Sequence, residues 1–433
     1  MRTSNALNQA ALLLLICSCT LATAPAQISV VNATAVGTVV DEKGGVLPGV
    51  TVRITNVGTN ITEQAVTDGE GRYRIGNLPP GDYRLEAELT GFKTAIVKGV
   101  KLEVKQTARY DLTLTIGQIS DKVEVVGEVA LLKADSAEIG SVVYERMIKE
   151  LPLNGRNYLQ LAYLTPGATT GSEAYGGYYG STAGTYNGLS SLQNEYQLDG
   201  GMNTSLDLIT VAVRPPVDAI REFKVETTSY SAEFGRAAGA VISAVTKSGT
   251  NEFHGGLWEF FRNDKLDARD FFSGTKPPYR QNQYGAMIGG PILKDKLFFF
   301  GSWEGSRIRQ GVNQTATVPT ALERAGDFSQ STRFGASQIY DPFNLDATGQ
   351  RTLFPGGKIP TSRFNAVAAK ALSYYPLPNI DGFPNYRVFP SIQQNNDKAL
   401  GRVDYKPSDK NTFFGRYAWE TEPRFEPAAI PLM

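Results

Sequence analysis

The N-terminal part of the chain alternates hydrophobic and polar positions in short runs. Between residues 35 and 115 the period is two, and turn sequences such as Pro79-Pro80-Gly81 separate the runs. A period of two turns successive side chains to opposite faces, which is typical of half-buried antiparallel strands. The pattern predicts a small β-sandwich with strands at 35–40, 50–54, 64–67, 72–75, 83–89, 93–97 and 108–115.

The middle of the chain mixes helical and strand patterns. Apolar residues at helical spacing between 144 and 151, ended by Pro152, predict a short helix. The apolar run around Val241 and Val245 predicts a strand that ends at the Gly249 turn. Together these elements indicate a domain of α+β type.

Beyond residue 251, aromatic and aliphatic side chains alternate with charged ones. Arg402, Asp404, Arg416 and Glu420 lie on the strand faces opposite the apolar residues. Lipid accepts apolar side chains and a wet lumen accepts charges, so this alternation indicates transmembrane β-strands. The positions on the apolar faces, strand by strand, are His254, Gly256, Trp258 and Phe260; Tyr284, Ala286 and Ile288; Leu297, Phe299 and Trp303; Val403 and Tyr405; and Phe413, Tyr417 and Trp419.

The connections between these strands alternate in length. Long segments at 263–282 and 305–396 alternate with tight turns at 293–296 and 406–410, as external loops and periplasmic turns do in bacterial barrels. The second long segment contains a helical pattern that ends at Pro376. About five strands are too few to close a transmembrane barrel, so we expect a fragment of a longer chain or a truncated gene product.

The amino-acid composition argues against several classes of function. Lys plus Arg and Asp plus Glu both number 43, so the chain lacks the excess of positive charge that nucleic-acid binders use, and no nucleic-acid partner is expected. The two cysteines, Cys17 and Cys19, and the one histidine, His254, cannot build a zinc site of the hydrolase type. We therefore expect no enzyme activity, no catalytic residue, no metal and no cofactor.

The first 26 residues predict a secretory signal peptide. Residues 10–21 are apolar, follow Arg2 and fall short of the roughly 20 residues that a bilayer-spanning helix needs. Ala24-Pro25-Ala26 predicts cleavage before Gln27. Ser18-Cys19 leaves a lipoprotein anchor as the alternative.

Turn motifs recur along the sandwich region, over residues 27–116. They are Gly37-Thr38-Val39-Val40-Asp41, Thr67-Asp68-Gly69-Glu70-Gly71-Arg72-Tyr73 and Leu78-Pro79-Pro80-Gly81-Asp82-Tyr83. They resemble the carboxypeptidase regulatory-like domain, which has a transthyretin-like fold. The resemblance implies the accessory sandwich of that family and not its peptidase. It also leaves an alternative function, a secreted or surface protein that binds carbohydrate or adheres through the sandwich.

A linker over residues 117–130 contains an extended, β-branched segment. It consists of Asp121, Lys122, Val123, Glu124, Val125 and Val126. It resembles the TonB box, which TonB-dependent receptors offer to a periplasmic energy transducer. Such a segment presents backbone N–H and C=O groups with which a partner strand can pair. An ordinary strand of the sandwich or of the linker is the alternative.

The region 131–250 carries short motifs in a set order. They are Leu151-Pro152-Leu153-Asn154-Gly155-Arg156-Asn157, Leu164-Thr165-Pro166-Gly167, Tyr196-Gln197-Leu198-Asp199-Gly200-Gly201 and the run 239–251. They resemble the plug domain of Oar-like TonB-dependent receptors. The resemblance implies four candidate plug residues, Arg156, Asp199, Gly200 and Arg236, and the three charged ones are candidates for plug–barrel ion pairs. Ordinary solvated surface charges are the alternative.

A run rich in Gly, Tyr, Ser and Thr lies between residues 171 and 188. Its composition indicates a loop. Tyrosine combines a stacking face with a hydroxyl group, so Tyr175, Tyr178 and Tyr179 are candidate ligand-loop residues. An ordinary surface loop is the alternative.

The patterns and resemblances together predict a mainly β protein. We expect a β-sandwich, an α+β plug and, over residues 251–433, the first strands of an incomplete transmembrane β-barrel. The expected function is that of a TonB-dependent outer-membrane receptor for energised uptake of an unknown small ligand, glycan or peptide. The expected partners are outer-membrane lipid and a TonB-like periplasmic transducer, with the sandwich and plug on the periplasmic side.

Overall fold

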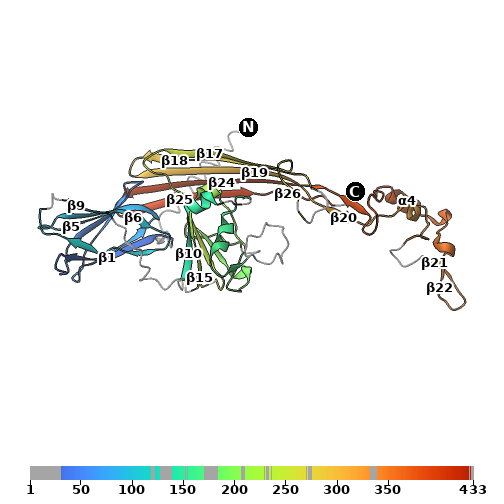
Figure 1. The fold of residues 1–433 in the computed structure, drawn as a ribbon, viewed down its shortest axis with the longest axis horizontal. Helices are drawn as coiled ribbons and strands as arrows, with labels where there is room; N and C mark the ends of the chain where they lie inside the picture. The colour runs from blue at the N-terminus through green and yellow to red at the C-terminus, as the bar shows by residue number, and fades with distance from the viewer. Residues whose placement is uncertain are drawn as a thin grey trace, which may run out of the picture. The chain divides into compact units, whose positions relative to one another are not determined.

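The chain is mainly β, with few helices, in the computed structural model (Figure 1), as predicted. The structure describes residues 31–118, 122–126, 139–151, 153, 155–169, 184–205, 210–228, 230, 234–235, 237–269, 271, 276–331, 339–428 and 430. The predicted signal peptide, Asp121, Arg236 and the tyrosines Tyr175, Tyr178 and Tyr179 lie outside the described residues. None of the described helices is long and apolar enough to cross a bilayer.

The N-terminal sandwich consists of two sheets. One sheet contains β1 (Ala33–Asp41), β4 (Arg72–Leu78), β7 (Thr107–Arg109) and β8 (Leu112–Leu114); the other has the order β3 (Thr62–Val66), β2 (Thr51–Asn56), β5 (Gly81–Glu88), β6 (Thr94–Leu102) and β9 (Lys122–Val126). Their apolar faces enclose a core that includes Ile54, Leu85 and Leu114. The strands predicted from the period of two are confirmed, and in β1 and β5 the buried positions alternate as the period requires.

The predicted strand 108–115 forms two strands, β7 and β8. Asp111 interrupts it, because the Asp111 Oδ1 accepts the N–H of Thr38 at 2.8 Å in place of a backbone carbonyl. At the same point Gly37 of β1 lies against the carbonyl of Tyr110, and a Cβ at residue 37 would overlap this oxygen. The close approach of two backbones therefore requires glycine at residue 37.

The region after the sandwich forms a five-stranded sheet, here called the central sheet. Its order is β10 (Ile139–Tyr144), β15 (Ile220–Thr228), β16 (Val241–Thr246), β13 (Glu195–Leu198) and β14 (Gly201–Met202). Strand β16 is buried along its whole length because β15 and β13 pair with its two edges. Helix α2 (Glu145–Glu150) follows β10 directly and buries Ile148. The predicted helix and strand are confirmed.

Shorter elements surround the central sheet. They are η2 (Tyr158–Leu164), β11 (Ala168–Thr169), β12 (Thr185–Tyr186), η4 (Ser191–Gln193) and η5 (Val217–Ala219). Tyr158 of η2 packs edge-on against Phe223 of β15, with ring centroids 5.5 Å apart. This contact places the apolar side of η2 in the core of the region.

The C-terminal region forms a sheet of long strands, here called the long-strand sheet. Its order is β17 (His254–Asn263), β18 (Tyr279–Leu293), β19 (Leu297–Gly311), β24 (Ser391–Ser408) and β25 (Asn411–Thr421), and β26 (Arg424–Phe425) pairs with β24. Exposure alternates as predicted in the last long strand. Tyr417 is 71% exposed, whereas the side chain of its neighbour Arg416 is 21% exposed. One face of these strands is therefore apolar and open, and the other carries sheltered charges.

Two aromatic side chains in β19 lie on the sheltered face. Phe298 and Phe300 are almost fully buried, and they alternate with the outward residues Leu297, Phe299 and Trp303. Phe300 packs with Ala219 and with Leu400 of β24. The sheltered face is therefore apolar as well as charged, because part of it packs against other protein and not against water.

The long connection between β19 and β24 has structure of its own. It contains β20 (Gln314–Ala316), α3 (Ala321–Arg324), β21 (Tyr340–Leu345), β22 (Arg351–Leu353), η6 (Pro355–Gly357), η7 (Thr361–Arg363), α4 (Ala366–Leu372) and β23 (Tyr386–Val388). The Asn365 side chain accepts the N–H groups of Val367 and Ala368 and so begins α4. The helix predicted in this segment is confirmed.

We predict that Gly37→Ala lowers the free energy of local unfolding of the sandwich by about 1–3 kcal/mol, the usual cost of forcing an extra methyl group into close-packed structure. Hydrogen exchange of the β1 amides, read by mass spectrometry, measures the change. Gly69→Ala is the matched control, because a Cβ at residue 69 has no neighbour within 4 Å. Equal exchange rates in the two variants would contradict the requirement for glycine at residue 37.

Candidate functional site

Asp199 occupies the first position of a two-residue turn between β13 and β14. The φ angle of Asp199 is +48° and that of Gly200 is +81°, and Leu198 pairs with Gly201 across the turn. Successive positive φ angles define the tight hairpin turn in which Asp-Gly is preferred, because both residues tolerate the left-handed conformation. The local sequence therefore places the Asp199 carboxylate at the end of the central sheet.

The Asp199 carboxylate is buried and has four partners. Its Oδ1 accepts the backbone N–H of Thr246 at 2.8 Å, and its Oδ2 accepts the Thr246 hydroxyl at 2.8 Å. Arg402 Nη1 lies 3.1 Å from Oδ1, and Arg416 Nη1 lies 2.7 Å from Oδ2. Strand β16 thus supplies two neutral donors, while β24 and β25 supply one guanidinium group each.

A second carboxylate balances the charge. Asp404 Oδ1 lies 2.7 Å from Arg402 Nη2, and Asp404 Oδ2 accepts Arg402 Nε at 2.9 Å, which is the bidentate geometry that strengthens such pairs. Asp404 Oδ2 also accepts the hydroxyl of Ser248 at 2.6 Å. Asp199, Arg402, Asp404 and Arg416, here called the four-charge cluster, carry two negative and two positive charges. This balance offsets much of the cost of burying them.

The four-charge cluster joins the central sheet to the long-strand sheet. Asp199 and Thr246 belong to the central sheet, and both arginines belong to neighbouring long strands. The Arg402 guanidinium also lies 5.0 Å from the centroid of the Phe414 ring. The arrangement holds two sheets together by charge.

The other predicted site residues have different surroundings. Arg156 also has a positive φ angle, +48°, and forms an ion pair with Asp218, which belongs to the same region of the chain. Arg236 and the three ligand-loop tyrosines lie outside the described residues. The prediction did not identify Arg402 and Arg416 as the partners of Asp199. The sequence signal for them was the alternation that put both on the charged face of their strands.

The TonB-box-like segment forms β9 over Lys122–Val126. Strand β9 pairs in parallel with β6, from Thr94↔Lys122 to Lys98↔Val126. Among the described residues β9 is the terminal strand of its sheet, because its pairing partner there is β6. In the described part of the chain the segment is therefore an edge strand of the sandwich.

A second buried carboxylate, Glu222 of β15, lies where the sandwich contacts the central sheet. Its Oε1 accepts the backbone N–H of Val104 at 2.5 Å. Burial raises the pKa of Glu222 to about 7; Glu103 adds to the rise, and the Val104 N–H, Arg221 and Lys101 oppose it. Removal from water disfavours the charged form of a carboxyl group.

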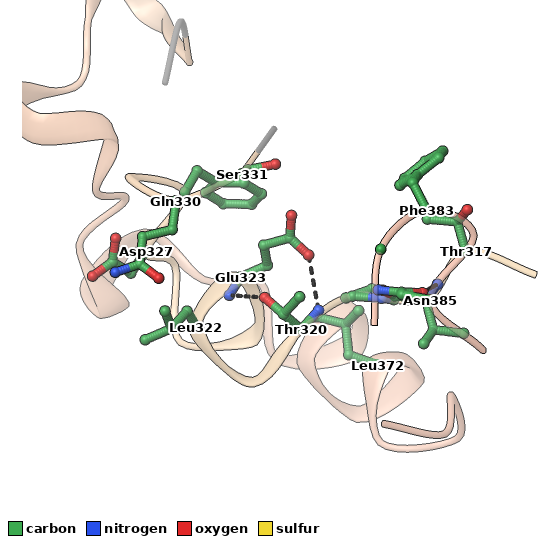
Figure 2. A pocket seen from close by; sticks show the side chains of 14 residues that line it. Thr317, Thr320, Leu322, Glu323, Asp327, Gln330, Ser331, Leu372, Phe383 and Asn385 are labelled. Carbon is green, nitrogen blue, oxygen red and sulfur yellow. Dashed lines mark hydrogen bonds between the residues drawn. The ribbon is translucent and has the colours of Figure 1, made fainter. Parts of the chain in front are cut away.

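The long connection between β19 and β24 encloses a cavity of about 340 Å³. Figure 2 shows that Thr320 and Glu323 face each other at one side of it, joined by the reciprocal hydrogen bonds that cap α3. The side-chain amide of Asn385 is also occupied, because it forms two hydrogen bonds of 2.8 Å with the backbone of Val318. The volume is within the range of small-molecule sites. The remaining lining residues include Leu322, Asp327, Phe328, Gln330, Leu372 and Phe383.

The described part of the chain contains no group of three or more His, Cys, Asp or Glu residues arranged to hold a metal ion. His254 Nδ1 lies 3.1 Å from the carbonyl oxygen of Glu252 in the same strand region. The contact is local, and the chemistry of the candidate site is that of ion pairs and hydrogen bonds.

Two family models match the chain. Residues 34–115 match the carboxypeptidase regulatory-like domain, and residues 245–433 match the outer membrane beta barrel domain. The TonB-dependent transporter Oar of Myxococcus xanthus is 31% identical over 322 residues, which cover 70% of this chain and 29% of Oar. The chain is a relative of the Oar-like TonB-dependent receptors. The match spans less than a third of the length of Oar.

Further similarities of this Oar-like chain are more distant or shorter. The probable TonB-dependent siderophore receptor PirA of Acinetobacter baumannii is 33% identical over 85 residues, which cover 19% of this chain and 10% of PirA. The solved structure of the outer membrane transporter YddB from Escherichia coli has a TM-score of 0.41 at 15% identity, over 67% of this chain and 34% of that chain. The structure of PirA has a TM-score of 0.37 at 16% identity, over 70% and 34%. The barrel family and the sequence relatives indicate the outer membrane as the location of the Oar-like chain.

We predict that Asp199→Asn loosens the central sheet from the long-strand sheet, because Arg416 loses its ion pair with Asp199 and Arg402 keeps only the one with Asp404. Removing one partner of a buried ion pair costs about 3–5 kcal/mol. Faster hydrogen exchange in β13 and β16 is the expected result. Asp409→Asn, at an exposed residue of the β24–β25 turn, is the matched control. A holding role for Asp199 is contradicted if the two variants exchange alike.

We predict that Glu222 makes stability depend on pH between about 4.5, the ordinary pKa, and about 7, its pKa in the folded chain. Below pH 4.5 the group is neutral whether the chain is folded or unfolded, and its contribution is fully present. As the pH rises to 7 the unfolded chain ionises first, so the contribution, on the order of 3 kcal/mol, is lost. The melting temperature relative to Glu222→Gln should fall across this window, and a constant difference would disprove the shift.

Proposed function

We propose that this chain belongs to an outer-membrane receptor that takes up a ligand with energy from a TonB-like periplasmic transducer. In this proposal the central sheet is the plug, and the long-strand sheet is part of the barrel wall. The four-charge cluster is the observation that carries the proposal. It attaches the central sheet to the charged face of strands whose other face is apolar and open.

The chemistry of this attachment suits a plug that moves. Ion pairs that separate inside a dry core leave unpaired charges at high cost, whereas ion pairs that separate into water regain their hydration. A barrel lumen is wet, so the arginines and Asp199 are solvated again once the central sheet shifts. The cluster therefore holds the plug at rest and still permits displacement.

The segment Asp121–Val126 is the proposed contact for the transducer. Its described part, β9, lies at the edge of a sheet, where an extended partner can add a strand through backbone hydrogen bonds. The ligand class stays open between a small molecule, a glycan and a peptide. For ligand contact we propose the tyrosine loop with Tyr175, Tyr178 and Tyr179, together with the cavity beside α3 and α4.

We predict that deleting residues 121–126 in the intact receptor abolishes energised uptake and leaves ligand binding unchanged, because the transducer loses its pairing strand. Titration calorimetry with the purified periplasmic domain of the transducer should show the loss of binding directly. Val123→Thr is the matched control, since threonine keeps the β-branched strand residue and every backbone hydrogen-bonding group. Unchanged uptake after the deletion would remove the TonB-box assignment.

A further inference from the structure

The sandwich binds β9 along its whole described length. Five residue pairs, from Thr94↔Lys122 to Lys98↔Val126, align β9 with β6 in parallel register. The hydrogen bonds of a parallel ladder are evenly spaced along the strand. A pull along the axis of β9 therefore loads all of them at once, and the ladder resists such a pull better than one that opens it from one end.

The three residues that follow β6 are bonded to the central sheet. Glu103, Val104 and Lys105, here called the clasp, follow β6 directly. Lys105 Nζ lies 2.9 Å from Glu226 Oε2, and the two side chains are 6% and 0% exposed. The Val104 N–H donates to Glu222. The clasp is therefore bonded to β15, the second strand of the central sheet.

Two further contacts extend the clasp. Glu103 Oε1 accepts the hydroxyl of Tyr144 at 2.7 Å, and Tyr144 ends β10, the neighbour of β15. Val104 packs in a small apolar cluster with Val31 and Val245, and Val245 belongs to β16. Three adjacent strands of the central sheet thus contact three consecutive residues. Separating the clasp from the sheet would break the buried Lys105–Glu226 ion pair, although Glu226 would keep Lys224 at 3.1 Å. Breaking a buried ion pair is costly, so this contact resists rupture.

Two routes lead from β9 to the central sheet. Residues 127–138 connect Val126 to Ile139, the first residue of β10. The other route crosses the ladder from Val126 to Lys98 and reaches Val104 of the clasp six residues later. Counted in residues, the route through the clasp is the shorter one.

We propose that the sandwich is the force-carrying link between the transducer and the plug. This inference rests on the proposed function, because it takes β9 as the strand that the transducer pulls. The pull passes from β9 to β6 through their ladder and from β6 to β15 through the clasp. It reaches the central sheet by the route with fewer residues. The carboxypeptidase regulatory-like domain then has a mechanical role in transport and no need to bind sugar.

The test measures plug movement in living cells. Ser243→Cys places a reporter thiol in the fully buried strand β16 of a chain whose other cysteines are Cys17 and Cys19. The readout is the rate at which a fluorescent maleimide labels position 243, located by mass spectrometry, in cells with the transducer minus the rate in cells without it. In the same experiment, calorimetry with the periplasmic domain of the transducer reports whether β9 is recognised.

The clasp variant is Lys105→Gln, which removes the cation of the clasp and leaves Glu226 paired with Lys224 at 3.1 Å. We expect a several-fold lower transducer-dependent labelling rate with unchanged affinity for the transducer domain. Arg53→Gln is the matched control, because Arg53 pairs with Glu88 across two sandwich strands at the surface; it should label like the parent. Equal labelling of the clasp variant and the parent overturns the inference.

A disulfide between β9 and β6, here called the staple, tests whether β9 transmits force while it stays paired with β6. Lys98→Cys with Val126→Cys joins two directly paired residues, whose separation in a sheet suits a disulfide. The oxidised staple should keep transducer-dependent labelling, because β9 stays on β6 while it is pulled. Labelling that stops on oxidation and returns on reduction would overturn the inference, since β9 would then have to leave β6. If the transducer domain does not bind the parent at β9, the proposed function itself fails.

Discussion

The carboxylate of Asp199 accepts hydrogen bonds from Thr246 and lies against two guanidinium groups, so one side chain connects the central sheet with two long strands. The Asp-Gly turn, with two positive φ angles, puts Asp199 at the end of its hairpin, and all of these partners of the carboxylate lie outside that hairpin. Asp404 supplies the second negative charge. Without that balance, two buried arginines would carry a desolvation cost that the attachment does not repay.

Both attachments of the central sheet combine charges with apolar contacts. The long-strand side has the four-charge cluster and an apolar cluster of Ala219, Phe300 and Leu400. The sandwich side has a buried ion pair, a buried carboxylate and the apolar cluster around Val104. The charges differ in exposure: the Arg416 and Asp404 side chains are 21% and 20% exposed, whereas those of Lys105 and Glu226 are 6% and 0% exposed. In the proposed function the more exposed attachment separates while the sandwich stays bound.

Much of the fold was predictable, because period-two alternation specifies which face of a strand is buried before any partner is known. Sandwich strands such as β1 and β5 and the long strand β25 follow that rule. Helix α2 follows instead from helical spacing, and β16, which is buried on both faces, from its apolar run. The departures have local causes. Asp111 divides a predicted strand because its side chain replaces a backbone acceptor. Phe298 and Phe300 lie on the sheltered face because that face packs against other parts of the protein.

The sequence by itself determined the strand patterns, the Asp-Gly turn at residue 199 and the charged faces of β24 and β25, because each depends on neighbours within a few positions. Only the tertiary structure decided which charges meet. Asp199 and Arg402 are separated by 203 residues, and Lys105 and Glu226 by 121. No local pattern encodes such pairs, since any surface carboxylate suits any arginine until the sheets are packed together. The same holds for β9, whose extended sequence suits many edges and whose place on β6 is set by the assembled sandwich.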